Sequence, residues 1–253
     1  MKVLSTVLIL SLVTSSFMWV NIGLYEFLNF ESIKAIGRFI DEFFPPNLEK
    51  TFLTSVAIAL YETLAMSILG TFFATIFGLT IAYMIVENKK SVLDKFQSSV
   101  FRGLLNILRS IPEVVWAAIL IISAGLGPFT GCLAIIIHTT GVLGRLFTDA
   151  FENCTPISSR TLRVNGCSFF QGFIYGKFFQ LTPQIISYVL YRWENNIRVA
   201  SILGIVGAGG LGQLLTFNLG LFLMDKAATV IIATMILIVI VDGLSSTIRR
   251  SLN

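Results

Sequence analysis

The chain has 253 residues, of which 55% are hydrophobic and only 13% are charged. Soluble globular domains carry about 25% charged residues, so the composition excludes a water-soluble enzyme or binding module and predicts an integral membrane protein. The net charge of +4 does not indicate nucleic acid, because the basic residues flank apolar runs and are better explained as signals of membrane topology.

Six apolar runs are long enough to cross a bilayer, since about 20 apolar residues span the hydrocarbon core. The first, 3–24, follows Met1-Lys2 and exceeds the apolar region of a signal peptide, so an uncleaved helix is favoured over a cleaved signal. The second run is too long for one perpendicular helix, and its start is expected to form an amphipathic turn. The remaining runs follow in chain order: the second lies within Leu53–Val86, and the others near 104–124, 129–147, 184–206 and 226–244.

The segment between the first two runs, 26–50, predicts a short amphipathic helix from Glu31 to Phe43, stopped by Pro45-Pro46. Its apolar residues repeat at helical spacing, and such a helix is expected to lie on the membrane surface; a solvated linker is the alternative. The positions concerned are Ile33, Ile36, Phe39, Ile40 and Phe43.

Lysine and arginine are unevenly distributed, which predicts the orientation of the chain. The outer segment 26–50 has three basic residues against five acidic ones. With both termini in the cytoplasm, the inner segments collect most of the basic residues. These are Lys2, Lys89, Lys90, Lys95, Arg102, Arg145, Arg160, Arg163, Lys177, Arg249 and Arg250.

The longest inner connection, 148–183, is rich in aromatic residues and carries Arg160, Arg163 and Lys177. Exposed apolar patches usually mark interaction sites, so this loop is expected to pack on the membrane or to dock into a partner.

Several strings resemble the phosphonate-transport permeases (PhnE type), which are inner-membrane subunits of type I ABC importers. The strings are Phe43-Phe-Pro-Pro46, Ser123-Ala-Gly-Leu-Gly-Pro-Phe129, Ile137-His-Thr-Thr-Gly-Val-Leu143, Ser187-Tyr-Val-Leu-Tyr-Arg-Trp-Glu-Asn-Asn-Ile-Arg198 and Val206-Gly-Ala-Gly-Gly-Leu-Gly212. The resemblance implies an all-α, polytopic membrane protein with about six spans and a MetI-like fold. Residues 1–50 would hold the first span and a periplasmic amphipathic segment, and 51–248 the permease domain with coupling loop 148–183.

In that family a coupling motif, roughly Glu-Ala-Ala-x-x-x-Gly, docks into the ATPase subunit. The matching stretch is Arg160-Thr-Leu-Arg-Val-Asn-Gly166. Gly166 is kept, but Arg160 replaces the acid, and Phe179 stands where a proline is usual. The resemblance therefore implies ATPase coupling through Arg160, Arg163 and Gly166, without the usual salt bridge.

The fifth run contains charges that are costly at mid-bilayer. Glu194 and Arg198 are four residues apart with the acid first, the favourable order for a helical ion pair. Arg192 points to another face, so its charge needs a partner on another helix, a water-filled path or an anion. A structural ion network between helices and a route for an anionic substrate both remain open. The candidate path residues are Tyr188, Arg192, Glu194, Asn195 (or Asn196), Arg198 and His138.

Gly207, Gly209, Gly210 and Gly212 match a dinucleotide-binding pattern, but they follow a membrane span where that fold needs a strand. A gate or a tight helix turn is the better explanation. His138, the only histidine, has no acid close in sequence and is expected to be a packing residue with a hydrogen bond. Glu62, Glu113 and Asp242 are isolated acids, and Glu113 follows Pro112, where a kinked helix start would aim it inward. Gly70 and Gly78, with Ala74 between them, have the spacing for close helix packing.

The 253 residues contain no GxxxxGK[ST] motif, catalytic constellation or metal-ligand cluster, so the chain is expected to be a transport subunit that is not an enzyme and holds no cofactor. ATP and Mg²⁺ would bind a separate ATPase. The resemblance implies two such ATPase subunits, a periplasmic or lipoprotein binding protein, a second permease copy and membrane lipid as partners, without nucleic acid. The cargo would be a phosphonate or a related oxyanion such as phosphite or phosphate. A same-fold permease for another solute, or a scaffold or sensor without transport, are the alternatives.

Overall fold

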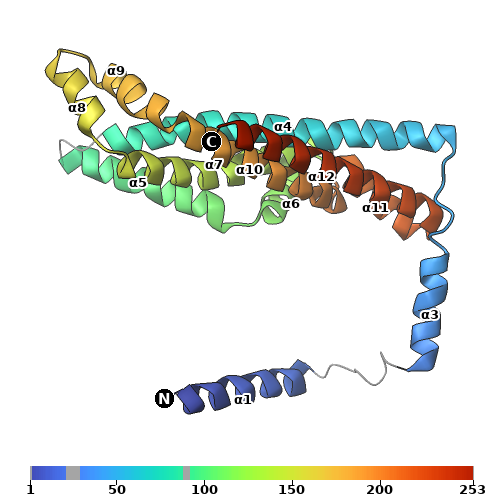
Figure 1. The fold of residues 1–253 in the computed structure, drawn as a ribbon. Coiled ribbons are helices and arrows are strands. Elements are labelled where there is room, and N and C mark those ends of the chain that lie inside the picture. The colour runs from blue at the N-terminus through green and yellow to red at the C-terminus, as the bar shows by residue number, and fades with distance from the viewer. Residues whose placement is uncertain (1, 21–28, 88–91, 253) are drawn as a thin grey trace. The chain divides into compact units, whose positions relative to one another are not determined.

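The computed structural model describes residues 2–20, 29–87 and 92–252. Every regular element in these ranges is helical, which confirms the all-α prediction (Figure 1). The chain divides into two compact units, Met1–Pro45 and Pro46–Asn253. The end of the first predicted span, residues 21–24, and the basic pair Lys89-Lys90 lie outside the described residues.

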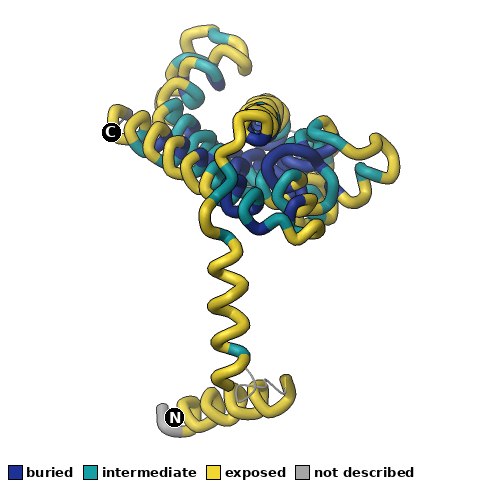
Figure 2. Tube along the Cα trace, turned by 90° about the vertical axis from the view of Figure 1, so that its right-hand side faces the viewer, coloured by how far each residue is buried: buried dark blue, intermediate teal, exposed yellow. Residues whose placement is uncertain are grey.

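The first unit holds two helices, α1 (Lys2–Val20) and α3 (Phe30–Asp41). Helix α3 matches the predicted amphipathic helix and ends before Pro45-Pro46, because proline cannot continue a helix. Its apolar stripe, including Ile33 at 53% and Phe39 at 48% exposure, is uncovered within the unit. Figure 2 shows both helices exposed along nearly their whole length. Such a stripe is the feature expected of a helix that lies on a membrane surface.

The second unit begins with α4 (Lys50–Glu87), one continuous helix of 38 residues. At 1.5 Å per residue it is about 57 Å long. The expectation of a separate turn at its start is therefore wrong. No proline interrupts this stretch, and its two glycines are tolerated because both lie in helix contacts.

The third predicted span, 104–124, is also wrong as a single helix. It is divided between α5 (Val92–Ser110) and α6 (Glu113–Ala124), which meet at an angle of 91°. Pro112 causes the break, because proline lacks an N–H donor and disfavours helical geometry in the residue before it. The indole Nε1–H of Trp116 donates to the carbonyl of Leu108 at 3.1 Å and fixes the corner.

The rest of the unit comprises α7 (Pro128–Asn153), α8 (Ile157–Val164), α9 (Phe169–Phe173), a π-helical turn η1 (Ile174–Phe178), α10 (Phe179–Leu203), a 3₁₀ turn η2 (Gly204–Val206), α11 (Gly210–Gly220) and α12 (Met224–Leu252). Three of the described helices, α4, α7 and α12, are each long and apolar enough to cross a membrane. The count rises to five if the bent pairs α5–α6 and α10–α11 each form one span. These five and the shorter apolar helix α1 occupy the six predicted runs.

Helices α4 and α7 approach closely through small residues. A Cβ on Gly70 would lie 2.5 Å from Cγ2 of Ile135, and one on Gly78 would lie 3.0 Å from the backbone nitrogen of Gly144. Ala74, between the two glycines, is fully buried. The predicted packing role of these small residues is confirmed, and it places α7 at the centre of the helices that hold the site.

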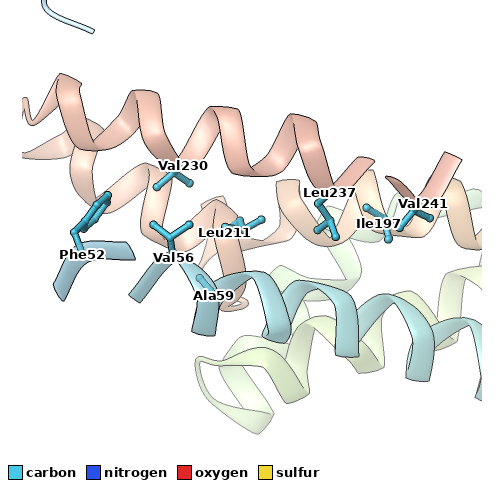
Figure 3. Close-up of a cluster of buried hydrophobic side chains, with 8 residues drawn as sticks. All are labelled: Phe52, Val56, Ala59, Ile197, Leu211, Val230, Leu237 and Val241. Atoms are coloured by element: carbon cyan, nitrogen blue, oxygen red, sulfur yellow. The ribbon is translucent and has the colours of Figure 1, made fainter. Parts of the chain in front are cut away.

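Apolar clusters hold the other helices against this pair. One cluster joins α4, α10, α11 and α12 (Figure 3), and its members are Phe52, Val56, Ala59, Ile197, Leu211, Val230, Leu237 and Val241. Figure 2 shows the same pattern at the level of the backbone, with buried positions where helices meet and exposed positions outside. Helix α10 is thus packed against several helices, and one face of it, which includes the 58% exposed Tyr191, is open within the described chain.

Candidate translocation path

A buried polar cluster lies where α6, α7 and α10 meet. Nη2–H of Arg192 donates to Oε1 of Glu113 at 2.7 Å, and Nδ1 of His138 lies 2.5 Å from the same oxygen. The three side chains are only 11–17% exposed. Nε2 of His138 lies 3.2 Å from the carbonyl oxygen of Arg109, which is in the last turn of α5. Arg192 therefore has the interhelical partner that its charge requires.

The geometry also indicates where the protons of this cluster lie. The carbonyl of Arg109 can only accept, so Nε2 of His138 carries a hydrogen. Nη2 of Arg192 also lies 3.1 Å from Nδ1 of His138, so the guanidinium contacts both the carboxylate and the imidazole.

A second chain of hydrogen bonds runs from the cluster to α4. Nε–H of Arg192 lies 3.4 Å from Oγ1 of Thr139, whose hydroxyl donates to Oδ1 of Asn196 at 3.1 Å. Nδ2–H of Asn196 donates to Oγ1 of Thr71 at 2.8 Å. Asn196 and Thr139 are fully buried. Of the two neighbouring asparagines, Asn196 is therefore the one that holds helices together.

The predicted ion pair between Glu194 and Arg198 is wrong. Arg249 lies 2.7 Å from Oε1 of Glu194, and Arg198 pairs with Asp242. Both partners belong to α12. This helix runs antiparallel to α10, so that Arg249 lies beside Glu194 and Asp242 lies beside Arg198. Since an exposed pair within one helix contributes only about 0.3–0.5 kcal/mol, contacts to a second helix override the local preference.

The open side of α10 carries a polar stripe. Gln184, Tyr188, Tyr191, Asn195 and Arg198 recur at spacings of four and three residues, which places them on one helix face. Tyr191 is 58% exposed, and the side chain of Arg198 is 42% exposed. A polar face on a membrane helix needs water or another protein against it. The structure thus separates the predicted path residues into two groups: Tyr188, Asn195 and Arg198 on the open face, and His138, Arg192 and Glu194 in buried contacts behind it.

The glycine-rich stretch forms a tight turn between α10 and α11. Gly207, Gly209 and Gly210 have φ angles of +92°, +81° and +70°, which L side chains rarely adopt. The backbone N–H of Gly210 donates to Oε2 of Glu62 at 2.9 Å, so a carboxylate from α4 caps the positive end of α11. Gly212 faces the backbone of α10 so closely that a side chain there has no space. These contacts explain all four glycines as turn and packing residues.

The segment predicted to couple to an ATPase forms a short helix with defined ends. Helix α8 ends at Val164, and the φ of +88° at Gly166 allows the N–H of Cys167 to donate to the carbonyl of Leu162 at 3.0 Å. The guanidinium of Arg163 stacks 4.4 Å over the ring of Phe169 and ties α8 to α9. Arg160, also on α8, is exposed.

Sequence reasoning missed three partners of the charges in α10. Glu113 and Asp242 were identified only as isolated acids, and Arg249 only as a topology signal. One signal was available, because the apolar runs contain four acids and four arginines, with Lys226 at the edge of the last run. Equal numbers of opposite charges at membrane depth indicate interhelical pairs. Tyr191 was also missed as a path residue, although the period of the stripe includes it.

Comparisons with known proteins agree with this architecture. Residues 74–253 match the family described as binding-protein-dependent transport system inner membrane component. The chain is 33% identical over 191 residues to the phosphite transport system permease protein PtxC of Stutzerimonas stutzeri, covering 76% of this chain and 69% of the relative. It is 28% identical over 217 residues to the phosphate-import permease protein PhnE of Mycolicibacterium smegmatis, covering 86% of this chain and 40% of that longer one.

Solved structures show the same fold. An inward-facing structure of the MetNI methionine ABC transporter superposes with a TM-score of 0.71 at 18% identity, covering 81% of this chain and 100% of that one. A structure of an amino acid ABC transporter superposes with a TM-score of 0.62 at 15% identity, covering 81% of this chain and 99% of that one. The chain therefore belongs to the family of binding-protein-dependent transport system inner membrane components, the permease subunits of ABC importers.

Proposed function

We propose that this permease imports a phosphorus oxyanion: a phosphonate, phosphite or phosphate. The observation that carries the substrate class is the similarity to a phosphite permease at 33% identity and to a phosphate-import permease at 28%. The site supports the same class, because the stripe on the open face of α10 carries hydroxyl and amide donors and the partly exposed guanidinium of Arg198, and none of its five residues is acidic. Hydrogen-bond donors and a guanidinium are complementary to the acceptor oxygens of an anion and unfavourable for a cation.

The polar stripe on α10 is the proposed surface of the path. Tyr188, Tyr191 and Asn195 present hydroxyl and amide groups, and Arg198 presents part of its guanidinium. The buried residues His138, Arg192 and Glu194 hold α10 in place behind that surface. A second copy of the permease would face this stripe and close the path, which gives a homodimer with two α10 helices lining one pore.

The chain is a transport subunit and not an enzyme, and its family works with a binding protein. We place the orientation with both termini in the cytoplasm, following the excess of basic residues in the inner segments. On that orientation α8 faces the cytoplasm, where Arg160, Arg163 and the turn at Gly166 would dock into an ATPase that binds ATP and Mg²⁺. The turn from Gly207 to Gly212, capped by Glu62, would lie toward the outside and act as a gate.

The test is ATP hydrolysis by the reconstituted complex of permease, ATPase and binding protein, titrated separately with methylphosphonate, phosphite and phosphate. Stimulation by one of these anions and not by methionine identifies the cargo. Omitting the binding protein is the control, and it should remove the stimulation. Stimulation only by a solute of another class refutes the oxyanion assignment, and failure of any ATPase to co-purify supports a scaffold or sensor.

A further inference from the structure

A cavity of about 600 Å³ lies between the first half of α10 and the end of α12. Its walls include Gln184, Ser187, Tyr188 and Tyr191 from α10, and Arg249 from the last turns of α12. In Figure 1 the end of α12 lies beside the start of α10. The cavity is separate from the Glu113–His138–Arg192 cluster, none of whose members lines it.

The cavity walls carry hydrogen-bond donors whose capacity is not used within the described chain. The side-chain hydroxyl of Ser187 makes no hydrogen bond to any described residue, whereas the hydroxyls of Thr182 and Ser201 on the same helix both donate to carbonyls four residues earlier. The hydroxyl of Tyr191 likewise has no partner among the described residues. Nε2–H of Gln184 donates to the oxygen of Tyr188 at 2.6 Å, which leaves the phenolic hydrogen of Tyr188 available to donate.

Arg249 adds a positive charge to these donors. One of its nitrogens lies 2.7 Å from Oε1 of Glu194, and its side chain is 28% exposed. A guanidinium has five N–H groups, so the ion pair leaves most of them unoccupied. Among the residues that the structure describes, no acidic side chain lines the cavity, and Glu194, which pairs with Arg249, has only 9% of its side chain exposed. A group of donors around one cation, without a carboxylate on the wall, is complementary to an anion with several acceptor oxygens.

We infer that this cavity is a second oxyanion site, which binds a tetrahedral phosphorus oxyanion through Arg249, Ser187, Tyr188 and Tyr191. The identity of the anion as the transported cargo rests on the proposed function. On the proposed orientation the cavity opens at the cytoplasmic end of the path, where a transported anion would bind before its release. The same chemistry fits the phosphate of a lipid headgroup. Gln180, also on the wall, lies 3.5 Å from the hydroxyl of Thr155 just before α8, so the site adjoins the coupling segment.

The test uses the permease–ATPase complex without its binding protein, in nanodiscs of zwitterionic lipid, with methylphosphonate as the probe. Binding is measured as broadening of the methylphosphonate ³¹P resonance, which is resolved from that of lipid phosphodiesters. We expect R249Q to weaken binding about tenfold or more, because a charge-assisted hydrogen bond is lost. We expect Y191F and S187A to weaken it a few-fold each, and R250Q, an exposed neighbour outside the cavity, to match the wild type.

Y191F and S187A keep the Arg249–Glu194 ion pair, so their effect does not depend on the stability of R249Q. Equal broadening in the wild type, R249Q and Y191F, or no broadening at all, overturns the site. If adding phosphatidylglycerol abolishes the broadening in the wild type, the lipid competes for the site, which confirms the anion chemistry and assigns the occupant as a lipid phosphate. If the broadening persists, the occupant is a free oxyanion. Normal stimulation of ATP hydrolysis through the binding protein, with no broadening, refutes this site and leaves the proposed function standing.

Discussion

The clearest energetic prediction concerns the buried contact between Glu113 and Arg192. The variant E113Q removes the carboxylate that faces Arg192 at 2.7 Å, in a place where the two side chains are 17% and 15% exposed. Breaking a buried pair by removing one partner costs about 3–5 kcal/mol, because the remaining charge is left uncompensated. We therefore expect E113Q, and separately R192M, to lower the free energy of unfolding by about 3 kcal/mol.

The double variant separates this mechanism from general loss of packing. In E113Q/R192M no unpaired charge remains, and the amide of the new glutamine can donate to Nδ1 of His138. Replacing a buried ion pair by neutral groups is often close to neutral in energy. We expect the double variant to lie within about 1.5 kcal/mol of the wild type, so that the two substitutions are strongly non-additive.

The measurement is equilibrium unfolding in mixed micelles of dodecyl maltoside and SDS, followed by tryptophan fluorescence. D149N is the matched control, because Asp149 forms a more exposed pair with Arg145 at 3.1 Å within one helix, and its loss should cost less than about 1 kcal/mol. If the double variant loses the sum of the two single effects, the charges act independently and the argument from uncompensated burial is wrong.

Three further substitutions test separate contacts. Gly78→Ala places a methyl group 3.0 Å from the backbone of α7 and should lower the free energy of unfolding by about 1–3 kcal/mol in the same assay. The control Gly243→Ala, where no atom lies within 4 Å, should not lower it. Equal effects of the two substitutions would refute the close-packing argument. Glu62→Leu should lower the thermal midpoint more than Glu62→Gln, because an amide oxygen can still accept from the N–H of Gly210; equal midpoints would show that this cap is unimportant. Arg160→Glu should leave the unfolding free energy within about 0.5 kcal/mol of the wild type, since the residue is exposed, but should reduce the ATPase recovered by affinity purification; unchanged recovery would remove Arg160 from the docking surface.

The positions of the spans could be predicted from the sequence, because a run of about 20 apolar residues has few other physical explanations. The bend in the third span could not be predicted, since the direction of the chain after Pro112 depends on what α6 packs against. Tertiary contacts also decided the partners of the charges. Glu194 and Arg198 have the right spacing to pair locally, but the sequence does not show that α12 brings Arg249 and Asp242 to the same face.

The residues of the candidate site also fall into those that local sequence predicts and those that depend on tertiary contacts. The period of the stripe on α10 is a local property, so Tyr188, Asn195 and Arg198 could be placed on one face in advance. The burial of Arg192 is a non-local property, because it depends on a corner at Pro112 that carries Glu113 to α7. For the same reason His138, with no acid near it in sequence, contacts a carboxylate from 25 residues earlier in the chain.

The two sets of ion pairs restrict the motions by which this permease can transport. Arg192 fixes α10 to α6 and α7, while Glu194 and Arg198 fix its other side to α12 at two levels, through Arg249 and Asp242. Sliding α10 along its axis would break all three pairs, and separating the buried Arg192–Glu113 pair alone would cost about 3–5 kcal/mol. Rotating α4, α6, α7, α10 and α12 together breaks none of them and keeps both the close packing of α4 on α7 and the hydrogen bond from Asn196 to Thr71. A rigid-body motion of these helices, with changes of backbone conformation confined to the glycine turn before α11, is therefore the low-energy route between the two access states.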